Sequence, residues 1–350
     1  MKLFVTGGAG FIGSNFIRHA LESNKKYSVV NYDKLTYAAN PANLKSIAGD
    51  PRYRFAKGDI CDAGAVEAAM RGCDAIVHFA AESHVDRSIY EPTPVIETNV
   101  TGTFVLLQIA RRIGIKRFVH ISTDEVYGDL SPGTFANEKS PLQPSSPYSA
   151  SKAAGDLLVL SFVRTYGVPA LITRSSNNYG PRQFPEKFLP LMITNALVGK
   201  PLPIYGDGVQ QRDWLHVEDN CRAILAVLER GRIGEIYNIG GMCVEENLTM
   251  TKRILRAMGK SETLLAFVKD RPGHDRRYAL NCKKAEEELG WKPTIPLDEG
   301  LRQTIKWYES NTDWLASVHA GEYRSYYEKY YDNRDSSLRG IAPSEPKSLH

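Results

Sequence analysis

The chain has 350 residues, of which 42% are apolar and 24% charged, a composition that suits a globular protein with a large buried core. The 44 basic and 40 acidic side chains nearly balance, so we expect no nucleic-acid or membrane partner. The five cysteines include no pair spaced as in a zinc or thioredoxin-like site, no apolar run is long enough to span a membrane, and the N-terminus leaves no room for a signal peptide, which together predict a cytoplasmic protein without a metal site.

Short apolar runs alternate with amphipathic stretches through the first half of the chain. This alternation predicts an α/β fold, in which helices cover both faces of a doubly wound parallel sheet. The expected strands are residues 3–6, 28–32, 53–57, 75–78, 117–122 and 170–174, and the expected helices are residues 11–22, 63–70, 93–113 and 148–166.

Three glycines follow the first expected strand and open the first helix. In the spacing Gly7-x-x-Gly10-x-x-Gly13, the glycines permit a tight turn, a close approach to a pyrophosphate and close packing of helix on strand. Asp33 ends the second strand, where a carboxylate binds ribose hydroxyls and repels a 2′-phosphate. The pattern predicts a Rossmann-type site for NAD rather than NADP; a glycine-rich turn without a ligand is the alternative.

Two later segments extend this expected cofactor site. Asp59 and Ile60 follow the third strand and are placed to hold an adenine ring. Residues 79–83 follow the fourth strand, and their small side chains allow a cofactor to lie close. A plain close-packed loop explains the second segment nearly as well.

Tyr148 and Lys152 are four residues apart in the helix expected after Pro147, so their side chains share one face. A neighbouring ammonium group stabilises a phenolate. We therefore expect Lys152 to lower the pKa of Tyr148, which allows Tyr148 to act as a base, and to bind the nicotinamide ribose. The same spacing at residues 53 and 57 is discounted because it falls in an expected strand.

The fifth strand ends in three polar residues, Thr123, Asp124 and Glu125, which are expected to point into the same site. Two neighbouring carboxyl groups can hold different protonation states, one acting as an acid and the other as a base. A simple alcohol dehydrogenase needs only Ser or Thr, Tyr and Lys, so the two carboxyls indicate additional proton chemistry. The alternative is a strand-ending turn in which Glu125 is solvated or ion-paired.

After residue 175 turn-forming residues become frequent and helical stretches become shorter. We expect residues 1–175 to form the NAD-binding Rossmann domain, residues 176–335 to form mainly a smaller C-terminal substrate-binding lobe, and residues 336–350 to form a flexible tail. Residues 213–216 and 235–239 are expected to return to the main sheet. Helices are expected at residues 219–230 and 249–258, and at the Tyr-rich residues 322–332.

With these motifs in place, residues 1 to about 331 closely resemble the dTDP-glucose 4,6-dehydratases of the extended short-chain dehydrogenase/reductase class. Residues 80–88, 185–187 and 212–214 are among the stretches that carry this resemblance. The glycine and Tyr–Lys motifs mark only the superfamily, whereas residues 123–125 and 271–278 are much more discriminating. The resemblance implies NAD-dependent conversion of dTDP-glucose to dTDP-4-keto-6-deoxyglucose, a step in deoxysugar biosynthesis such as that of dTDP-rhamnose, with the downstream pathway left open.

The resemblance also implies a role for each catalytic residue. Tyr148 takes the proton of the sugar O4 while a hydride passes from C4 to NAD, and Thr123 hydrogen-bonds the sugar near O4. The new ketone acidifies the C5 proton, which Glu125 removes. Asp124 protonates the C6 hydroxyl as it leaves as water, and the hydride returns to C6.

Two binding sets and an assembly are implied as well. The family forms homodimers through two helices per subunit, here residues 93–113 and 148–166. The cofactor set is Gly7, Gly10, Phe11, Ile12, Gly13, Asp33, Lys34, Leu35, Thr36, Asp59, Ile60, Phe79, Ala80, Ala81, Ser83, Thr98, Tyr148, Lys152 and Asn178. The substrate set, which holds the sugar and the thymidine diphosphate, is Ser83, Thr123, Asn177, Lys187, Phe188, Pro203, Tyr205, Arg212, Asn247, Arg271 and His274.

Three alternatives remain open. One is another nucleotide-sugar dehydratase, since a hydrophobic pocket distinguishes thymine from uracil by only about 1–3 kcal/mol. A second is an epimerase or decarboxylase of a UDP-sugar, although such enzymes generally lack the adjacent Asp–Glu pair. A third is a regulator that binds NAD without turnover, against which intact Tyr148, Lys152 and Glu125 argue. For single residues the alternatives are structural: a solvated cation for any Arg or Lys, and a structural hydrogen-bonder for His274.

Overall fold

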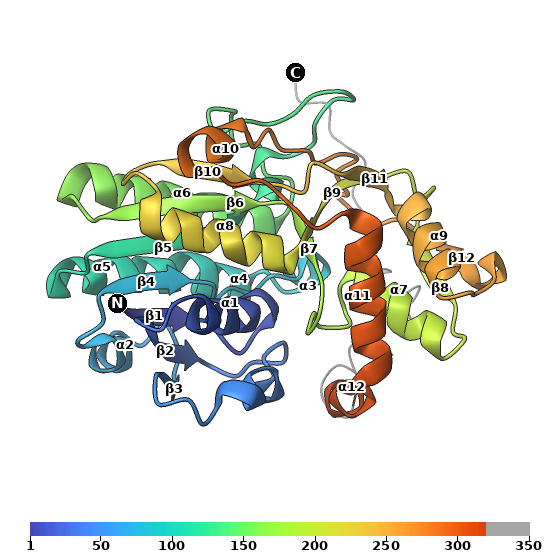
Figure 1. Ribbon diagram of the computed structural model, residues 1–350. Coiled ribbons are helices and arrows are strands. Elements are labelled where there is room, and N and C mark those ends of the chain that lie inside the picture. Colours follow the sequence, from blue (N-terminus) through green and yellow to red (C-terminus); the bar gives the residue numbers. More distant parts are fainter. Residues whose placement is uncertain (320–350) are drawn as a thin grey trace, which may run out of the picture.

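A seven-stranded parallel sheet organises the computed structural model, which describes residues 1–319 (Figure 1). The strand order is β10-β6-β5-β4-β1-β2-β3, and this confirms the predicted α/β doubly wound class. The order reverses at β1, which is where ligands of such sheets bind, beyond the carboxyl ends of the strands. The strands are β1 (Lys2–Thr6), β2 (Ser28–Asp33), β3 (Tyr53–Lys57), β4 (Ala75–His78), β5 (Arg117–Thr123), β6 (Ala170–Ser175) and β10 (Ile236–Ile239).

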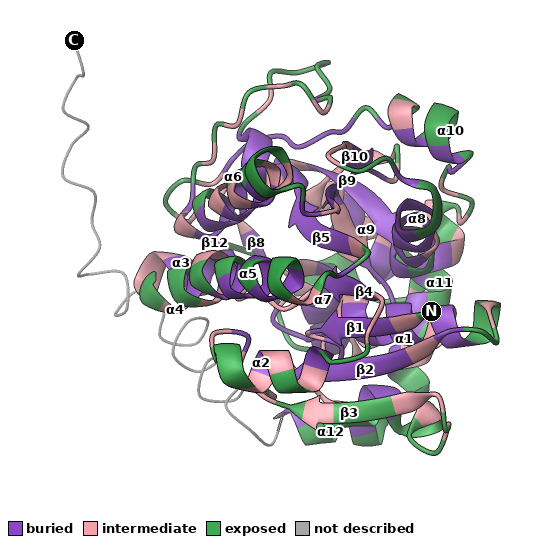
Figure 2. Cartoon of the chain, turned by 90° about the vertical axis from the view of Figure 1, so that its left-hand side faces the viewer, coloured by how far each residue is buried: buried purple, intermediate pink, exposed green. Residues whose placement is uncertain are grey.

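Helices cover both faces of this sheet, and the strands alternate between the two cores. In β1, Leu3 and Val5 face one core while Phe4 faces the other. Figure 2 shows the buried sides of the helices turned toward the strands. One face carries α1 (Phe11–Ser23), α8 (Val217–Arg230) and α10 (Lys283–Leu289), and the other carries α2 (Ala63–Met70), α5 (Thr103–Ile113) and α6 (Pro147–Tyr166).

A second lobe lies beside the sheet and has its own apolar core, which includes Met192, Met250 and Tyr308 (Figure 1). Its small sheets have the orders β11-β9-β7 and β12-β8. The strands are β7 (Asn177–Tyr179), β8 (Leu202–Tyr205), β9 (Gln211–His216), β11 (Val244–Glu246) and β12 (Leu265–Val268). The helices are α7 (Phe188–Leu197), α9 (Asn247–Ala257), α11 (Leu297–Ser310) and α12 (Thr312–His319).

Of the two segments expected to return to the main sheet, one does. β10 pairs with β6 in parallel, which confirms the prediction for residues 235–239. The prediction for residues 213–216 is wrong, because β9 pairs instead with β7 and β11. β7 begins two residues after β6 ends, in the stretch where the sequence is rich in turn-forming residues. It gives β9 a partner strand in the second lobe.

The helix expected at residues 93–113 is helical throughout but not uniform. It consists of α4 (Thr93–Ile96), a wider π-helical segment η2 (Glu97–Gly102) and α5. The wide turn carries Asn99, whose side chain donates to the Glu82 carbonyl at 3.0 Å and to Ser151 Oγ at 2.8 Å. A local bulge of this kind has no signature in apolar spacing, and it fixes the loop after β4 against α6.

The remaining short helices are η1 (Pro41–Ile47), α3 (Val85–Tyr90), η3 (Asp124–Tyr127) and η4 (Glu262–Leu264). Between residues 1 and 319, no helix combines the length and apolar character needed to cross a membrane. The helix expected at residues 322–332 and the tail expected at residues 336–350 lie outside the described residues.

Candidate active site

The glycine loop between β1 and α1 has the geometry that its spacing predicts. Gly7 adopts φ +68°, and a Cβ there would lie 2.6 Å from the backbone N of Ala80. A Cβ at Gly13 would lie 2.4 Å from the Gly7 carbonyl oxygen, so this glycine allows the helix to pack on the loop. Gly10 is the N-cap of α1 and provides no side-chain cap, which leaves the first N–H groups of the helix available to an anion.

Asp33 ends β2 and is buried beside this loop. Its Oδ2 accepts a hydrogen bond from the Ala9 N–H and its Oδ1 from the Leu35 N–H, both at 2.8 Å. Burial raises the pKa of Asp33, although the two N–H groups act against that rise. Lys34 Nζ lies 2.7 Å from Asp59 Oδ2, which ties together the segments that follow β2 and β3.

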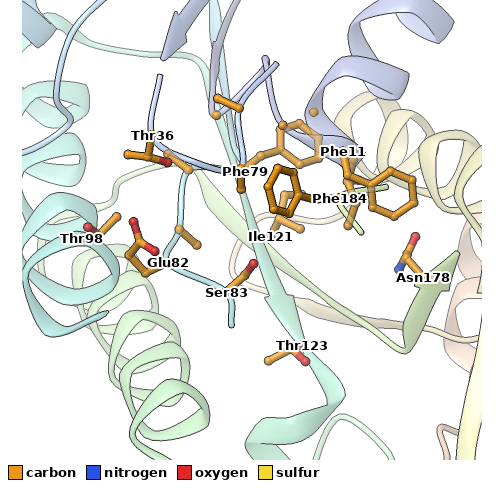
Figure 3. Close-up of a pocket in the computed structure, with 18 of the residues that line it drawn as sticks. Phe11, Thr36, Phe79, Glu82, Ser83, Thr98, Ile121, Thr123, Asn178 and Phe184 are labelled. Carbon is orange, nitrogen blue, oxygen red and sulfur yellow. The ribbon is translucent and has the colours of Figure 1, made fainter. Parts of the chain in front are cut away.

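A cavity of about 310 Å³ extends from the glycine loop to the end of β5 (Figure 3). Figure 3 shows Thr36, Thr98 and Glu82 on one side of it, with Phe11, Phe184 and Asn178 on the other. Every residue of the predicted cofactor set lines this cavity except Leu35, which instead donates its backbone N–H to Asp33. All five predicted catalytic residues line it as well.

Tyr148 and Lys152 stand in the first two turns of α6. Ser146 caps this helix, and Ser146 and Ser149 form a capping box that fixes where it begins. Lys152 Nζ donates to the Ile121 carbonyl at 2.7 Å, and burial lowers the pKa of Lys152 to about 8. The helix therefore brings both side chains under the carboxyl end of β5.

The pKa of Tyr148 departs from the expected direction. Its phenol is buried, and burial together with the charges of Glu125 and Asp124 raises the pKa of Tyr148 above the ordinary value. The sequence predicts a lowering by Lys152, but the ammonium of Lys152 is turned to a backbone carbonyl. The spacing of four residues correctly predicts a shared helix face and does not reveal the two carboxyls opposite it.

Asp124 and Glu125 follow β5 in the short helix η3. Thr123 Oγ1 accepts from the Glu125 N–H and donates to Asp124 Oδ1, both at 3.2 Å. Asp124 Oδ2 is buried without a hydrogen-bond partner among the described residues. Burial, with Glu125 and Asp213 nearby, raises the pKa of Asp124 well above the usual range, and burial also raises that of Glu125.

A second cavity of about 150 Å³ adjoins the first, and Asn177, Glu125, Glu186 and Lys187 line both. Nine of the eleven residues in the predicted substrate set line this second cavity. The other two, Ser83 and Thr123, line the first cavity only. The first cavity therefore holds the catalytic residues, and the second, between α3 and the second lobe, holds three cations together with the carboxyls of Asp86, Glu125 and Glu186.

The predicted cations of the second cavity are held by the protein itself. Lys187 Nζ donates to the Ser83 carbonyl, and Arg212 donates to the carbonyls of Gln211 and Asp275 at 2.8 and 2.9 Å. His274 Nδ1 lies 2.6 Å from Asp270 Oδ1, and burial lowers the pKa of His274 to about 3. His274 thus has a structural partner and also lines the second cavity, so its role in substrate binding stays a prediction.

Several residues of the cavities were given no role by the sequence. The second cavity is also lined by Asp86, Glu186, Trp214 and Tyr278. Trp214 Nε1 is a buried donor without a partner among the described residues. All four stand in stretches that carry the family resemblance, residues 80–88, 185–187, 212–214 and 271–278, and that position is the only signal the sequence offers for them.

A family profile described as GDP-mannose 4,6 dehydratase matches residues 4–304. Curated relatives include the dTDP-glucose 4,6-dehydratase of Haemophilus influenzae, which is 52% identical over 89% of this chain and 99% of that protein. They also include dTDP-glucose 4,6-dehydratase 1 of Escherichia coli K12, which is 49% identical over 95% of this chain and 100% of that protein.

Similar solved structures include a dehydratase at higher identity and an epimerase at lower identity. DesIV (dTDP-glucose 4,6-dehydratase) from Streptomyces venezuelae, with NAD and TYD bound, is 51% identical with a TM-score of 0.88 over 90% of this chain and 98% of that chain. The UDP-glucose 4-epimerase of Thermus thermophilus, in complex with NAD, is 30% identical with a TM-score of 0.83 over 89% and 100% of the two chains.

The parallel sheet, the glycine loop and the buried Tyr148–Lys152 pair define an enzyme of the extended short-chain dehydrogenase/reductase class. That class includes epimerases, to which the similarity is lower. The chain belongs to the nucleotide-sugar 4,6-dehydratase family, and within it to the dTDP-glucose 4,6-dehydratases.

Proposed function

We propose that this enzyme removes water from dTDP-glucose to give dTDP-4-keto-6-deoxyglucose, with NAD as a cofactor that is regenerated in each turnover. The observation that carries the proposal is the run Thr123-Asp124-Glu125 at the end of β5. It lines the same cavity as Tyr148 and Lys152, so an acid and a base stand beside an oxidation site. An epimerase has no use for this second acid–base pair.

The first cavity fits NAD on three counts. The uncapped N-terminus of α1 suits a pyrophosphate, the buried Asp33 carboxylate suits ribose hydroxyls, and its charge opposes a 2′-phosphate. When bound, NAD supplies a hydride acceptor and donor, and its nicotinamide cation favours the Tyr148 phenolate. In this scheme Tyr148 takes the sugar O4 proton, and Thr123 hydrogen-bonds the sugar near O4.

Asp124 is suited to be the general acid. Its carboxyl is buried next to Glu125 and Asp213, and these surroundings raise the pKa of Asp124 well above the usual range, which favours its protonated form. A protonated Asp124 can donate to the C6 hydroxyl as it leaves, and its Oδ2 has no hydrogen-bond partner among residues 1–319.

Glu125 is suited to be the base for the C5 proton. Burial raises the pKa of Glu125, while Arg271, Lys187 and Arg212 act against that rise and favour the carboxylate. A carboxylate with a raised pKa is a stronger base than a free one and can still be ionised near neutral pH. The two adjacent carboxyls therefore take opposite roles because the cations act mainly on Glu125.

The second cavity supports a nucleoside diphosphate as the other end of the substrate. Lys187, Arg212 and Arg271 line it together, and charge-assisted bonds to phosphate are strong. We assign residues 1–175, with β10, to cofactor binding and residues 176–335 mainly to substrate binding. The product then feeds a deoxysugar pathway, of which dTDP-rhamnose synthesis is one, and the five unpaired cysteines support a cytoplasmic location.

We also propose a homodimer that pairs through α5 and α6. Four large apolar side chains are exposed on α4, α5 and α6: Ile96, Phe104, Leu157 and Tyr166. Phe104 and Tyr166 both stack edge-on against Phe162, so they form one patch across two helices. Figure 2 shows the exposed side of α5 on the viewer's side of the molecule.

Incubation with three nucleotide sugars tests the reaction. We expect dTDP-glucose to give the alkali-dependent absorbance of a 4-keto sugar, with UDP-glucose and GDP-mannose much weaker. A signal from only one of the other two sugars would reassign the enzyme to a sister dehydratase. No signal from any of the three, with NAD still bound, would favour a regulator without turnover.

A further inference from the structure

Asp86 lies at the boundary between the two lobes and receives two donors from the second lobe. It stands on α3 and is 8% exposed. Its Oδ1 accepts from Arg271 Nη1 at 2.7 Å, and its Oδ2 accepts from the Tyr205 hydroxyl at 3.0 Å. Arg271 is 185 positions away in the sequence, so the contact exists only once both lobes have folded.

The three cations of the second cavity are held in different ways. Lys187 and Arg212 donate to backbone carbonyls, whereas Arg271 is ion-paired to a side-chain carboxylate. Arg271 Nε is buried and has no hydrogen-bond partner in residues 1–319. One edge of the guanidinium is therefore fixed by Asp86, while a buried donor is left for a ligand.

We propose that Asp86 is a positioning residue, which holds Arg271 so that its remaining N–H donors meet the diphosphate of the substrate. The inference rests on the proposed function, because it takes the second cavity as the site of a nucleoside diphosphate. By this inference Asp86, which belongs to the cofactor-binding residues 1–175, also contributes to binding the nucleotide.

Two effects oppose each other when Asp86 is removed. The carboxylate neutralises part of the charge on Arg271, so its loss would strengthen a purely Coulombic attraction to phosphate. It also orders a long side chain, and ordering that side chain at the moment of binding is costly. We therefore expect the loss of order to outweigh the Coulombic gain, so that removing Asp86 weakens diphosphate binding.

The test compares thymidine diphosphate with thymidine, which lacks the phosphates, by calorimetry on the NAD-loaded enzyme. We expect Asp86→Asn to weaken thymidine diphosphate binding by about tenfold and to leave thymidine within about twofold. KM for dTDP-glucose should rise by a similar factor while kcat changes little. Asp219→Asn is the matched control, since Asp219 is another buried, arginine-paired carboxylate but lies outside both cavities.

A second variant covers the case in which Asp86→Asn does not fold. Asp86→Glu keeps the negative charge beside Arg271 but moves the carboxylate by one methylene, and we expect it to weaken thymidine diphosphate binding as well. Unchanged or tighter diphosphate binding in the variants that fold would overturn the inference, as would an equal loss for thymidine. Failure of the wild-type enzyme to bind thymidine diphosphate would instead overturn the proposed function.

Discussion

Asp124 and Glu125 are neighbours in the sequence, yet their surroundings differ. Asp124 is 3% exposed and lies near Asp213. Glu125 lines both cavities, and the charges of three cations act on its carboxyl group. The sequence predicts that two carboxyls stand at the end of β5 and that one serves as acid and the other as base. It cannot give the physical cause, because Asp213 and Arg271 reach the site from the second lobe.

Glu125→Gln should separate proton removal from cofactor binding. An amide cannot take the C5 proton, so we expect turnover of dTDP-glucose to fall by about 10²–10⁴-fold. NAD content should stay at the wild-type level, and incorporation of solvent deuterium at C5 should be lost in mass spectra. Exposed Glu309→Gln is the control. Near-wild-type turnover in Glu125→Gln would exclude Glu125 as the base.

Asp124→Asn should change how the stability of the enzyme depends on pH. The folded pKa of Asp124 is raised, so the folded state binds more protons than the unfolded state above the ordinary pKa of about 3.9. This group therefore lowers stability as pH rises from that value toward its folded pKa. Asparagine removes the effect, and we expect the gain in Tm of the variant over wild type to be larger at pH 8 than at pH 5.

Exposed Asp313→Asn should show no such pH dependence and serves as the control in the same thermal scans. A gain that is equal at both pH values, or that shrinks as the pH rises, would contradict the assigned direction. Asp124→Asn should also lose dehydration activity, because an amide is a poor acid for the leaving hydroxyl.

At the scale of elements, two glycines with similar backbone angles provide a matched pair. Gly7 has φ +68° and would place a Cβ 2.6 Å from Ala80 N, while Gly72 has φ +73° with nothing within 4 Å. Each alanine variant should lose about 1–2 kcal/mol in the free energy of unfolding from backbone strain. Only Gly7→Ala also displaces the loop after β4, so it should lose more stability and purify without NAD.

Denaturant unfolding and the NAD content of purified protein measure both effects. Equal stability and equal NAD content in the two variants would show that the glycine loop tolerates a side chain. Gly72→Ala with reduced NAD would show that backbone strain alone disturbs the site from a distance.

The elements of the main sheet were predictable from the sequence, and the pairing of the strands in the second lobe was not. β1, β2, β4, β5 and β6 follow short runs that are mainly apolar, and α6 follows the start signal of Pro147. β9 was assigned to the wrong sheet, because the sequence of a strand does not name its neighbour, and the neighbour β7 is only three residues long. The π-helical segment at residues 97–102 could not be predicted either, since it widens the helical turn without changing the spacing of apolar residues.

At the scale of the whole molecule, Leu157→Lys should test the assembly. Leu157 is 57% exposed on α6, and a lysine there would bury a charge in an α5–α6 interface. We expect sedimentation velocity to give a dimer for wild type and a monomer for the variant. Val198→Lys, at a position 70% exposed outside these helices, should remain a dimer. A wild-type monomer, or a dimer in Leu157→Lys, would contradict the proposed interface.

The relation between the two lobes was the least predictable feature. Family resemblance places Arg271 in the substrate set, but only the folded chain brings it to Asp86. The same holds for Tyr37 and Glu186, which hydrogen-bond at 3.1 Å across 149 positions. Contacts of this kind join the loop after β2 to the second lobe, and no local pattern in the sequence encodes them.

The position of β10 at the edge of the main sheet also affects how the protein is made. Until residue 239 has left the ribosome, the outer backbone groups of β6 lack their partner strand. An open edge of this kind recruits strands from neighbouring chains. The nascent enzyme is thus most prone to aggregate between the synthesis of β6 and that of β10, and a fragment ending at residue 175 would keep that liability permanently.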